Sequence, residues 1–428
     1  MNAGKVFVKR YIIPSLQFLD TNPYLSSVRS GMVAIVPPLI IGSLFILIAN
    51  FPVPGWNAII APYLPLLKIP VSATYGLISV YVCLAISYDL GRLKGDDPLS
   101  CAIIAVLIFL MIHLVPAGTS GDYTLSMESL GSIGMFTAII IALVTVPVKI
   151  FLTNKKLVIR MPESVPPAVQ ESFRSLTPLF LLIIIFWLIR FVLDIAIDDI
   201  VQAIFHPLVF ALDTLPGILF YAFIVTILWS IGINGDNTMD SIVAPIFLMY
   251  LTANVEAISS GQPLPYITAS GFFSTFVNIG GTGATLALAF LMFRSKDPGY
   301  REVSRLSLPA QCFSINEPIF FGFPIVMNPV FMVPFIISTL ALTTGTFLLM
   351  DLGMISRPFI DVPWTTPPVI AHYLVTGGDI RAAIWGLVSI GIAMIIYYPF
   401  ARHAEKQRTN SDKEMDRADI ICQPDNIL

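Results

Sequence analysis

Residues 315–329 read Ile-Asn-Glu-Pro-Ile-Phe-Phe-Gly-Phe-Pro-Ile-Val-Met-Asn-Pro, and they place one carboxylate, Glu317, in an apolar run that three prolines interrupt. A carboxylate at membrane depth is costly, and by default it marks a substrate or ion site. The prolines and Gly322 predict a broken helix, whose backbone is tolerated in lipid only where it lines a cavity or packs in protein. We therefore expect the function of this chain to centre on Glu317.

The composition places the chain in a membrane. Of its 428 residues, 56% are hydrophobic and 12% are charged, and its mean hydropathy is +0.82. Several apolar runs approach or exceed the roughly 20 residues that a spanning helix needs, so we predict an all-α integral membrane protein. The 24 basic and 27 acidic residues offer no basic surface for nucleic acid. No His or Cys residues show metal-ligand spacing, and we expect neither a metal nor another cofactor.

Hydropathy defines some spans clearly and others poorly. Between residues 233 and 328 two apolar stretches, 242–253 and 272–293, are interrupted by Pro245, Gly271 and the pair Gly280-Gly281. Hydropathy does not decide whether they are tilted spans, half-helices or re-entrant hairpins. The clear spanning candidates are 32–51, 74–90, 100–116, 130–152, 176–197, 216–232, 329–350 and 382–401.

The distribution of basic residues predicts the topology. If the N-terminus is cytoplasmic and the chain crosses the bilayer ten times, 20 of the 24 Lys and Arg residues fall in cytoplasmic segments and three fall outside. Basic residues favour cytoplasmic loops, so we expect both termini in the cytoplasm. The remaining cation, Arg190, lies within a span, and its simplest partner is Asp194, one helical turn later.

A polar segment divides the chain. Residues 151–175 carry four basic residues and a proline-rich turn, and we interpret them as a cytoplasmic amphipathic linker. The N-terminal membrane half, 1–150, has regular spans, whereas 176–401 holds nearly all the interrupted ones. Residues 402–428 form a polar tail, expected to be an exposed helix end that leads into disorder.

Glu317 lies where a helix should begin. It follows Asn316 and precedes Pro318, and proline suits the first turn of a helix. A carboxylate at that end is stabilised by the helix dipole. The side chain is therefore either a buried helix cap, or a hydrogen-bond acceptor and proton acceptor for a polar solute. We favour the second interpretation, because an uncharged Ser or Asn would cap the helix at lower cost in lipid.

Two glycine-containing motifs also have two interpretations each. The turn that contains Asn234, Gly235 and Asp236 ends a span. It is either a plain cytoplasmic turn or a helix break that presents amides and a carboxylate to a solute. The stretch 276–285, which includes the binding candidates Asn278, Gly281 and Thr282, has backbone amides that attract anions or hydroxyl oxygens. Its glycines equally suit close helix packing, and it lacks the lysine of the nucleotide-binding pattern.

A tryptophan beside hydroxyl groups supplies a further candidate. Trp364 and Thr365 lie within Val362–Pro368, on the outer side by the charge distribution. Tryptophan next to hydroxyls suits stacking on a sugar ring, and it suits an interfacial aromatic anchor equally well. Both interpretations stay open at this point.

Together these motifs resemble enzyme IIC, the membrane subunit of a bacterial sugar phosphotransferase system (PTS), in its lactose/cellobiose/diacetylchitobiose family. The resemblance covers nearly the whole chain, and the Asn-Glu-Pro stretch followed by Phe-Gly-Phe-Pro-Ile-Val-Met-Asn-Pro is its most specific part. The other segments that carry it are Pro37–Ser43, Asp97–Ser100, Pro162–Pro166, Gly280–Leu286 and Pro363–Pro367.

The resemblance implies a fold, partners and a location. The family fold has about ten spanning helices with re-entrant hairpins in a bacterial cytoplasmic membrane, and it forms a homodimer largely through the N-terminal half. The C-terminal domain carries the sugar, whose 6-hydroxyl accepts a phosphoryl group from a cysteine on a separate IIB protein, itself supplied by IIA. The signature of that cysteine's loop is absent from this sequence, so the chain is expected to present the sugar and to carry no phosphorylated residue itself.

One position departs from the resemblance. Family members commonly have Gly-Ile-His-Gly where this chain has Gly232-Ile233-Asn234-Gly235. The histidine is thought to lie near the acidic residue and the sugar hydroxyl. Asn234 donates and accepts hydrogen bonds but takes no proton near neutral pH. Either Glu317 alone assists proton removal, or the asparagine reflects a different sugar or a loss of phosphorylation-coupled transport.

We expect phosphorylation-coupled import of a β-linked disaccharide such as cellobiose, with Glu317 as the general base. The alternative is a proton-coupled secondary transporter in which Glu317 or Asp236 relays protons, because broken helices at mid-membrane also fit that class. A membrane sensor is a third hypothesis, and it is disfavoured because no output domain is visible. The residues expected to bind the sugar are Asn234, Gly235, Asp236, Asn278, Gly281, Thr282, Asn316, Glu317, Trp364 and Thr365.

Overall fold

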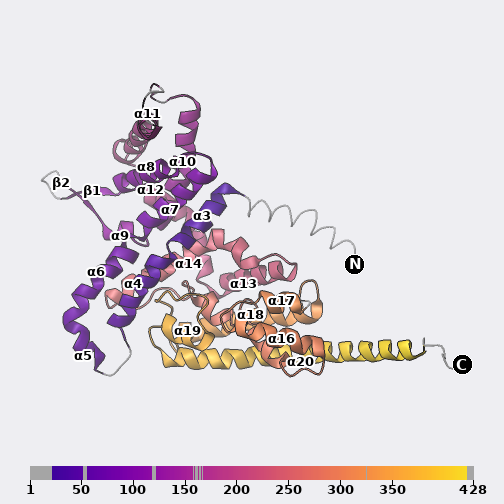
Figure 1. The fold of residues 1–428 in the computed structure, drawn as a ribbon. Coiled ribbons are helices and arrows are strands. Elements are labelled where there is room, and N and C mark those ends of the chain that lie inside the picture. Colours follow the sequence, from indigo (N-terminus) through magenta and orange to yellow (C-terminus); the bar gives the residue numbers. More distant parts are fainter. Residues whose placement is uncertain are drawn as a thin grey trace. The chain divides into compact units, whose positions relative to one another are not determined.

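The computed structural model describes residues 22–51, 55–117, 122–157, 159, 162, 165, 167–323 and 325–421. Within these residues the regular elements are helices, apart from a hairpin of β1 (Leu114–Ala117) and β2 (Asp122–Leu125), paired antiparallel with Leu114 opposite Leu125 (Figure 1). Seven described helices are long and apolar enough to cross a membrane, and a bent pair makes an eighth span. The predicted all-α membrane fold is confirmed, and the span count is roughly consistent with ten.

The chain divides into two compact units. The first unit comprises Met1–Asn50, Pro54–Phe210 and Asn237–Tyr266, and the second comprises Phe51–Val53, Ala211–Asp236 and Ile267–Leu428. These are units of packing, and the functional halves expected on either side of the 151–175 linker stay a prediction. Every residue expected to bind sugar belongs to the second unit.

The first unit is built around α7, which packs against α3, α8 and α10. The predicted span 100–116 ends earlier than expected, because α8 stops at Ile112 and the hairpin follows. Pro116 lies in β1, where its fixed φ and missing N–H are compatible with an edge strand. The helices of this unit are α3 (Pro23–Ala34), α4 (Val36–Ala49), α5 (Trp56–Ile60), α6 (Leu64–Thr74), α7 (Ile78–Leu93), α8 (Pro98–Ile112), α9 (Met127–Leu130), α10 (Met135–Asn154), α11 (Pro167–Trp187), α12 (Ile197–Leu212) and most of α14 (Gly235–Ser259).

The interrupted region resolves into one continuous helix and one broken segment. Pro245 lies inside α14, which is 25 residues long and is not interrupted by the proline. The stretch 272–293 does break: a π-helical turn, η5 (Phe272–Val277), is followed by irregular backbone, and α15 begins only at Leu286. The predicted pair Arg190 and Asp194 is present, with Nη1 and Oδ1 separated by 3.7 Å.

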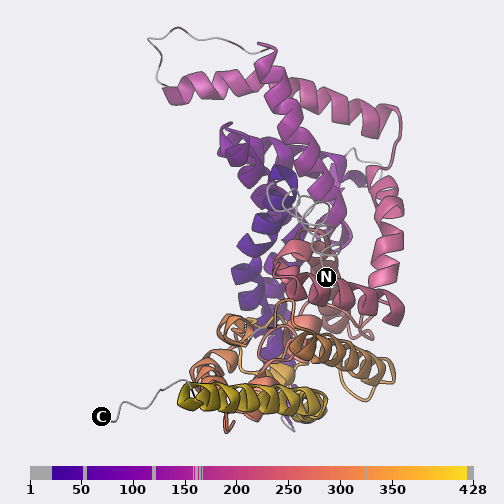
Figure 2. The same cartoon turned by 90° about the vertical axis from the view of Figure 1, so that its right-hand side faces the viewer.

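The second unit packs α18 against both α13 and α20, and α15 against α16 and α20. The predicted span 382–401 is only part of α20, which both views draw as a single long rod (Figures 1 and 2). Arg408 of α20 pairs with Asp297 (Nε to Oδ2, 3.3 Å), just before α16. The helices of this unit are α13 (Leu215–Ser230), α15 (Leu286–Met292), α16 (Pro298–Gln311), α17 (Glu317–Gly322), α18 (Pro329–Asp351), α19 (Pro368–Val375) and α20 (Ile380–Ile421).

Candidate functional site

The irregular backbone between η5 and α15 is a glycine segment, residues 278–285, that packs tightly against its neighbours. Gly280, Gly281 and Gly283 have φ values of 75°, 101° and 84°, a region that glycine occupies without steric cost. A Cβ on Gly281 would lie 2.4 Å from the Cβ of Asn316, and one on Gly283 would lie 2.1 Å from the Phe335 ring. The glycines therefore serve close packing, which was one of the two interpretations left open by the sequence.

Asn316 is held against this glycine segment. Its side chain is buried, and Nδ2 donates to the carbonyl oxygen of Thr282 at 3.2 Å. α17 begins at the next residue, Glu317, and Pro318 occupies its first turn, as the sequence predicts. The Asn-Glu-Pro stretch and the glycine segment, far apart in sequence, thus form one packed corner.

Glu317 is exposed at this corner. In the described part of the chain its carboxylate has no hydrogen-bond or ion-pair partner, and the residue before the helix, Asn316, makes no side-chain cap either. The interpretation of Glu317 as a buried helix cap is therefore wrong. A carboxylate that no internal group neutralises is free to accept a hydrogen bond or a proton from a guest molecule.

Asp236, by contrast, is fully engaged inside the protein. Its carboxylate accepts hydrogen bonds from Trp229 Nε1 at 2.7 Å, from Thr282 Oγ1 at 2.5 Å and from Asn278 Nδ2 at 3.4 Å. These donors come from the end of α13 and from the glycine segment. Asp236 therefore joins two elements that meet at the candidate site, and its carboxylate is held by protein donors.

Trp229 connects this network to α17, and the sequence did not single it out. While its N–H donates to Asp236, its ring packs edge-on against Phe320, with the centroids 4.8 Å apart. Phe320 lies one turn after Glu317. The only signal in the sequence was a tryptophan at the end of an apolar span, which equally marks a membrane interface.

Asn278 and Asn234 offer further polar groups. While Asn278 Nδ2 donates to Asp236, its Oδ1 atom is buried and has no partner among the described residues. Asn234 is half-buried in the turn before α14. The next residue, Gly235, lies so close to α13 that a Cβ there would be 2.2 Å from the carbonyl oxygen of Val225. This corner therefore contains a buried acceptor and a half-buried amide.

Trp364 and Thr365 lie in the connection between α18 and α19. Trp364 is 59% exposed, and within the described residues no hydrogen bond or ring contact links either side chain to the Glu317 corner. His372 of α19, by comparison, is buried with its ring 4.6 Å from that of Phe276, just before the glycine segment. Its Nε2 atom has no partner among the described residues. No local pattern in the sequence indicates that this histidine lies there.

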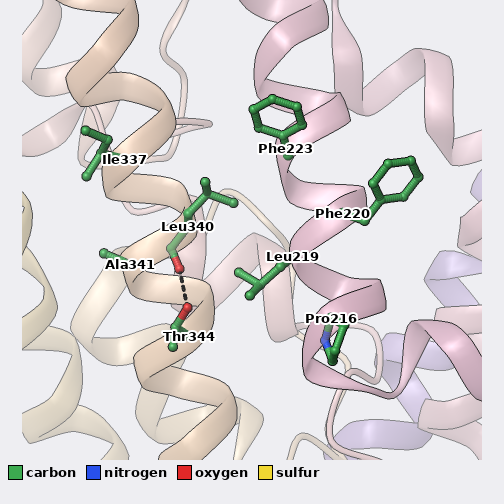
Figure 3. Close-up of a pocket in the computed structure, with 8 residues that line it drawn as sticks. All are labelled: Pro216, Leu219, Phe220, Phe223, Ile337, Leu340, Ala341 and Thr344. Atoms are coloured by element: carbon green, nitrogen blue, oxygen red, sulfur yellow. Dashed lines mark hydrogen bonds between the residues drawn. The ribbon is translucent and has the colours of Figure 1, made fainter.

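A groove with a volume of about 530 Å³ opens between α13 and α18, away from these residues (Figure 3). Its walls are almost entirely apolar, and the only hydroxyl among the lining residues, Thr344, donates back to the Leu340 carbonyl of its own helix at 2.8 Å. A hydroxyl-rich solute would find few hydrogen-bond partners there. The polar corner of Asn278, Asn316 and Glu317 is the better candidate site.

Comparisons with known proteins identify the family. Residues 29–339 match the family described as Phosphotransferase system, EIIC, and the chain belongs to it. The solved structure of the transporter ChbC, the IIC component from the N,N'-diacetylchitobiose-specific phosphotransferase system, is similar, with a TM-score of 0.87 and 32% identity. That likeness covers 95% of this chain and 99% of the other.

Three sequence relatives extend this finding. The chain is 35% identical to the putative permease IIC component YwbA of Bacillus subtilis over 95% of this chain and 97% of the relative. It is 33% identical to the lichenan permease IIC component of the same species, covering 97% of each. It is 34% identical to the cellobiose-specific EIIC component of Geobacillus stearothermophilus, covering 94% of each. The chain is thus a multi-pass membrane permease component of a sugar phosphotransferase system.

Proposed function

We propose that this chain imports a β-linked disaccharide such as cellobiose, which a separate IIB protein phosphorylates as it arrives. Relatives named for lichenan, cellobiose and oligo-beta-mannoside, together with a solved neighbour named for diacetylchitobiose, support this sugar class. All four names denote β-linked sugars. We place the protein in a bacterial cytoplasmic membrane, as a homodimer, with both termini in the cytoplasm.

The observation that carries the proposal is the free carboxylate of Glu317 beside a packed polar corner. A disaccharide is uncharged and rich in hydroxyl groups, so its site needs many hydrogen-bond partners and few charges. A buried polar group left without a partner costs about 1–3 kcal/mol, and the unpartnered Oδ1 of Asn278 is such a group. A sugar hydroxyl that donates to this oxygen relieves that cost. Asn234 and the backbone around Gly281 would bind other hydroxyls.

Glu317 acts as the general base in the transfer step. The oxygen of the sugar 6-hydroxyl attacks the phosphorus of the phosphocysteine on IIB, and an O–P bond forms as the S–P bond breaks. The hydroxyl proton passes to the Glu317 carboxylate, and the IIB cysteine leaves as a thiolate. Asn234 takes no proton near neutral pH, so in this chain the base is Glu317 and no imidazole is needed at that position.

Asp236 has a positioning role in this proposal. Its carboxylate accepts hydrogen bonds from Trp229, Asn278 and Thr282, so it orients Asn278 toward the sugar while keeping its own oxygens occupied. This engagement argues against Asp236 as a proton relay, and so weighs against the alternative of a proton-coupled secondary transporter. Glu317, which has no internal partner, would remain the relay in that alternative.

Uptake of radiolabelled cellobiose into vesicles separates the two functions. Vesicles that contain this chain, with phosphorylated IIB supplied on the inside, should accumulate only cellobiose phosphate, and vesicles without IIB should accumulate nothing. Accumulation of unmodified sugar in IIB-free vesicles under an imposed proton gradient would contradict the proposal and favour the secondary transporter.

A further inference from the structure

α16 leads directly to the candidate site and has two distinct faces. One face is buried and consists of Tyr300, Ser304, Ser307 and Gln311. On the other face Leu306 is 70% exposed, and Arg305 and Pro309 are exposed beside it. Past the end of the helix, Phe313 (51%) and Phe321 of α17 (71%) are exposed as well. We call this set the α16 surface: Arg305, Leu306, Pro309, Phe313 and Phe321.

The buried face fastens α16 to the site. Ser304 Oγ donates to the carbonyl oxygen of Ala289 at 2.5 Å, and Gln311 Nε2 donates to Thr285 Oγ1 of the glycine segment at 3.1 Å. A Cβ on Gly322, at the end of α17, would lie 2.4 Å from Cγ1 of Val303. α16 is therefore packed against both elements that position Glu317. A protein bound to α16 would consequently have a fixed position relative to the site.

The α16 surface also borders unpaired positive charge. Arg294, Lys296 and Arg305 are exposed, and none of them has an ion-pair partner among the described residues. Arg305 is held over the Phe293 ring, with its guanidinium carbon 5.4 Å from the centroid. Two other cations of this unit, Arg402 and Arg408, are instead paired with carboxylates. Three unpaired cations thus lie just before α16 and on its exposed face.

We infer that the α16 surface is the docking site for the phosphocysteine-bearing IIB protein, an inference that rests on the proposed function. The donor carries a dianionic phosphoryl group, which the unpaired cations would attract. A standard interface covers about 800 Å² on each partner, a patch roughly 30 Å across. α16 is about 21 Å long at 1.5 Å per residue and ends six residues before Glu317. A donor that delivers its phosphoryl group near Glu317 therefore covers α16 as well.

The mixture of residues on this face favours a protein over lipid. A helix that lies in a membrane surface separates an apolar stripe from a charged one. On α16 the exposed residues Glu302 and Arg305 alternate with Leu306 and Pro309. An exposed leucine between charged residues on one helix face matches the mixture of apolar and charged groups found in a protein interface.

Steady-state kinetics with phosphorylated IIB of the same system tests the inference. The double variant Arg305→Glu with Leu306→Ala should raise the KM for phosphorylated IIB at least tenfold, while kcat at saturating IIB and the Kd for cellobiose stay within twofold of wild type. The conservative double variant Arg305→Lys with Leu306→Met should keep the wild-type KM for phosphorylated IIB. Two exposed residues that are not part of the α16 surface serve as matched controls: Lys68→Glu, and Leu352→Ala, which is 71% exposed in wild type.

The outcomes separate this inference from the proposed function. If the wild-type chain binds cellobiose but phosphorylated IIB never modifies it, the proposed function fails. If wild type is active and the double variant keeps the wild-type KM, the docking inference is overturned. It is also overturned if a fluorophore at position 306 is quenched by lipid-phase quenchers and is unaffected by added IIB. A KM rise confined to the double variant supports the docking site.

Discussion

The two compact units differ in how many of their buried polar atoms lack a partner among the described residues. In the first unit the buried amine of Lys149 pairs with Asp96 at 3.1 Å, and the buried ring of His113 pairs with Asp198 at 3.1 Å. In the second unit five buried polar atoms have no partner among the described residues, compared with one in the first unit. They belong to Asn278, Gln311, Ser338, His372 and Ser389.

This difference suggests a division of labour. Breaking a buried ion pair is strongly destabilising, so paired charges of the kind found in the first unit suit a scaffold with one stable arrangement. Buried acceptors without internal partners suit a unit that binds water or a hydroxyl-rich guest. The same contrast recurs inside the second unit, where Asp236 is engaged by three donors and Glu317 by none.

The largest effect is expected from Glu317→Gln, which keeps the shape of the side chain and removes the base. General-base catalysis contributes about 10²- to 10⁴-fold, so we expect the rate of cellobiose phosphorylation by IIB to fall by at least about a hundredfold. Binding of cellobiose should change by less than tenfold. Rapid-quench kinetics and isothermal titration measure the two quantities.

The matched control for that variant is Glu128→Gln in the first unit, where Glu128 is also exposed. It should leave both the phosphorylation rate and the sugar affinity unchanged. A wild-type rate in the Glu317→Gln protein would mean that the unpaired carboxylate has no catalytic role.

The next largest effect tests the scaffold side of the comparison. Lys149→Met leaves the carboxylate of Asp96 buried without its cation, which costs about 3–5 kcal/mol. We expect the apparent melting temperature in detergent to fall clearly. Adding Asp96→Asn should recover part of the loss, because no charge is then left unpaired. A Lys149→Met protein as stable as wild type would show that the pair contributes nothing to the scaffold.

A smaller effect is expected from Thr282→Val, which removes a donor to Asp236 with little change in volume. A lost hydrogen bond to a carboxylate costs about 1–3 kcal/mol, so the orientation of Asn278 should loosen and the Kd for cellobiose should rise about tenfold. Thr339→Val is the control, because Thr339 Oγ1 only donates to the Phe335 carbonyl within α18. Equal effects of the two substitutions would remove the positioning role assigned to Asp236.

The smallest effect concerns Trp364, whose role the sequence left open. Stacking on a sugar ring would make Trp364→Ala weaken cellobiose binding by about 0.5–1.5 kcal/mol. A similar loss of affinity in the neighbouring Thr365→Val variant would place both residues at the sugar. If Trp364 is an interfacial anchor, its substitution should change protein stability in lipid and leave the affinity for cellobiose untouched.

The sequence predicted those features that depend on local patterns. The span expected at 329–350 is α18, Pro329–Asp351, because a long apolar run has few alternatives in a membrane protein. The helix start at Glu317 followed from proline's preference for the first helical turn. Pro245 left open whether residues 242–253 form a continuous span; α14 is continuous, because a proline within a helix is tolerated where its neighbours compensate for the lost hydrogen bond.

The features that sequence could not predict are contacts between distant segments. Asp236 and Thr282 are 46 residues apart, and nothing in the local sequence around either residue indicates that they are hydrogen-bonded. The same holds for Trp229, because the contact between its ring and Phe320 depends on how α13 and α17 pack together. Whether Glu317 would be enclosed or exposed depended on the packing of α16 and the glycine segment, which no local pattern encodes.

The most direct test of the account is an experimental structure with cellobiose bound. We predict the sugar 6-hydroxyl within about 2.6–3.2 Å of a Glu317 carboxylate oxygen, which is the reach of a general base, and another sugar hydroxyl donating to Asn278 Oδ1. A sugar bound far from both residues, with Glu317 surrounded by lipid chains and no water-filled space beside it, would contradict the account.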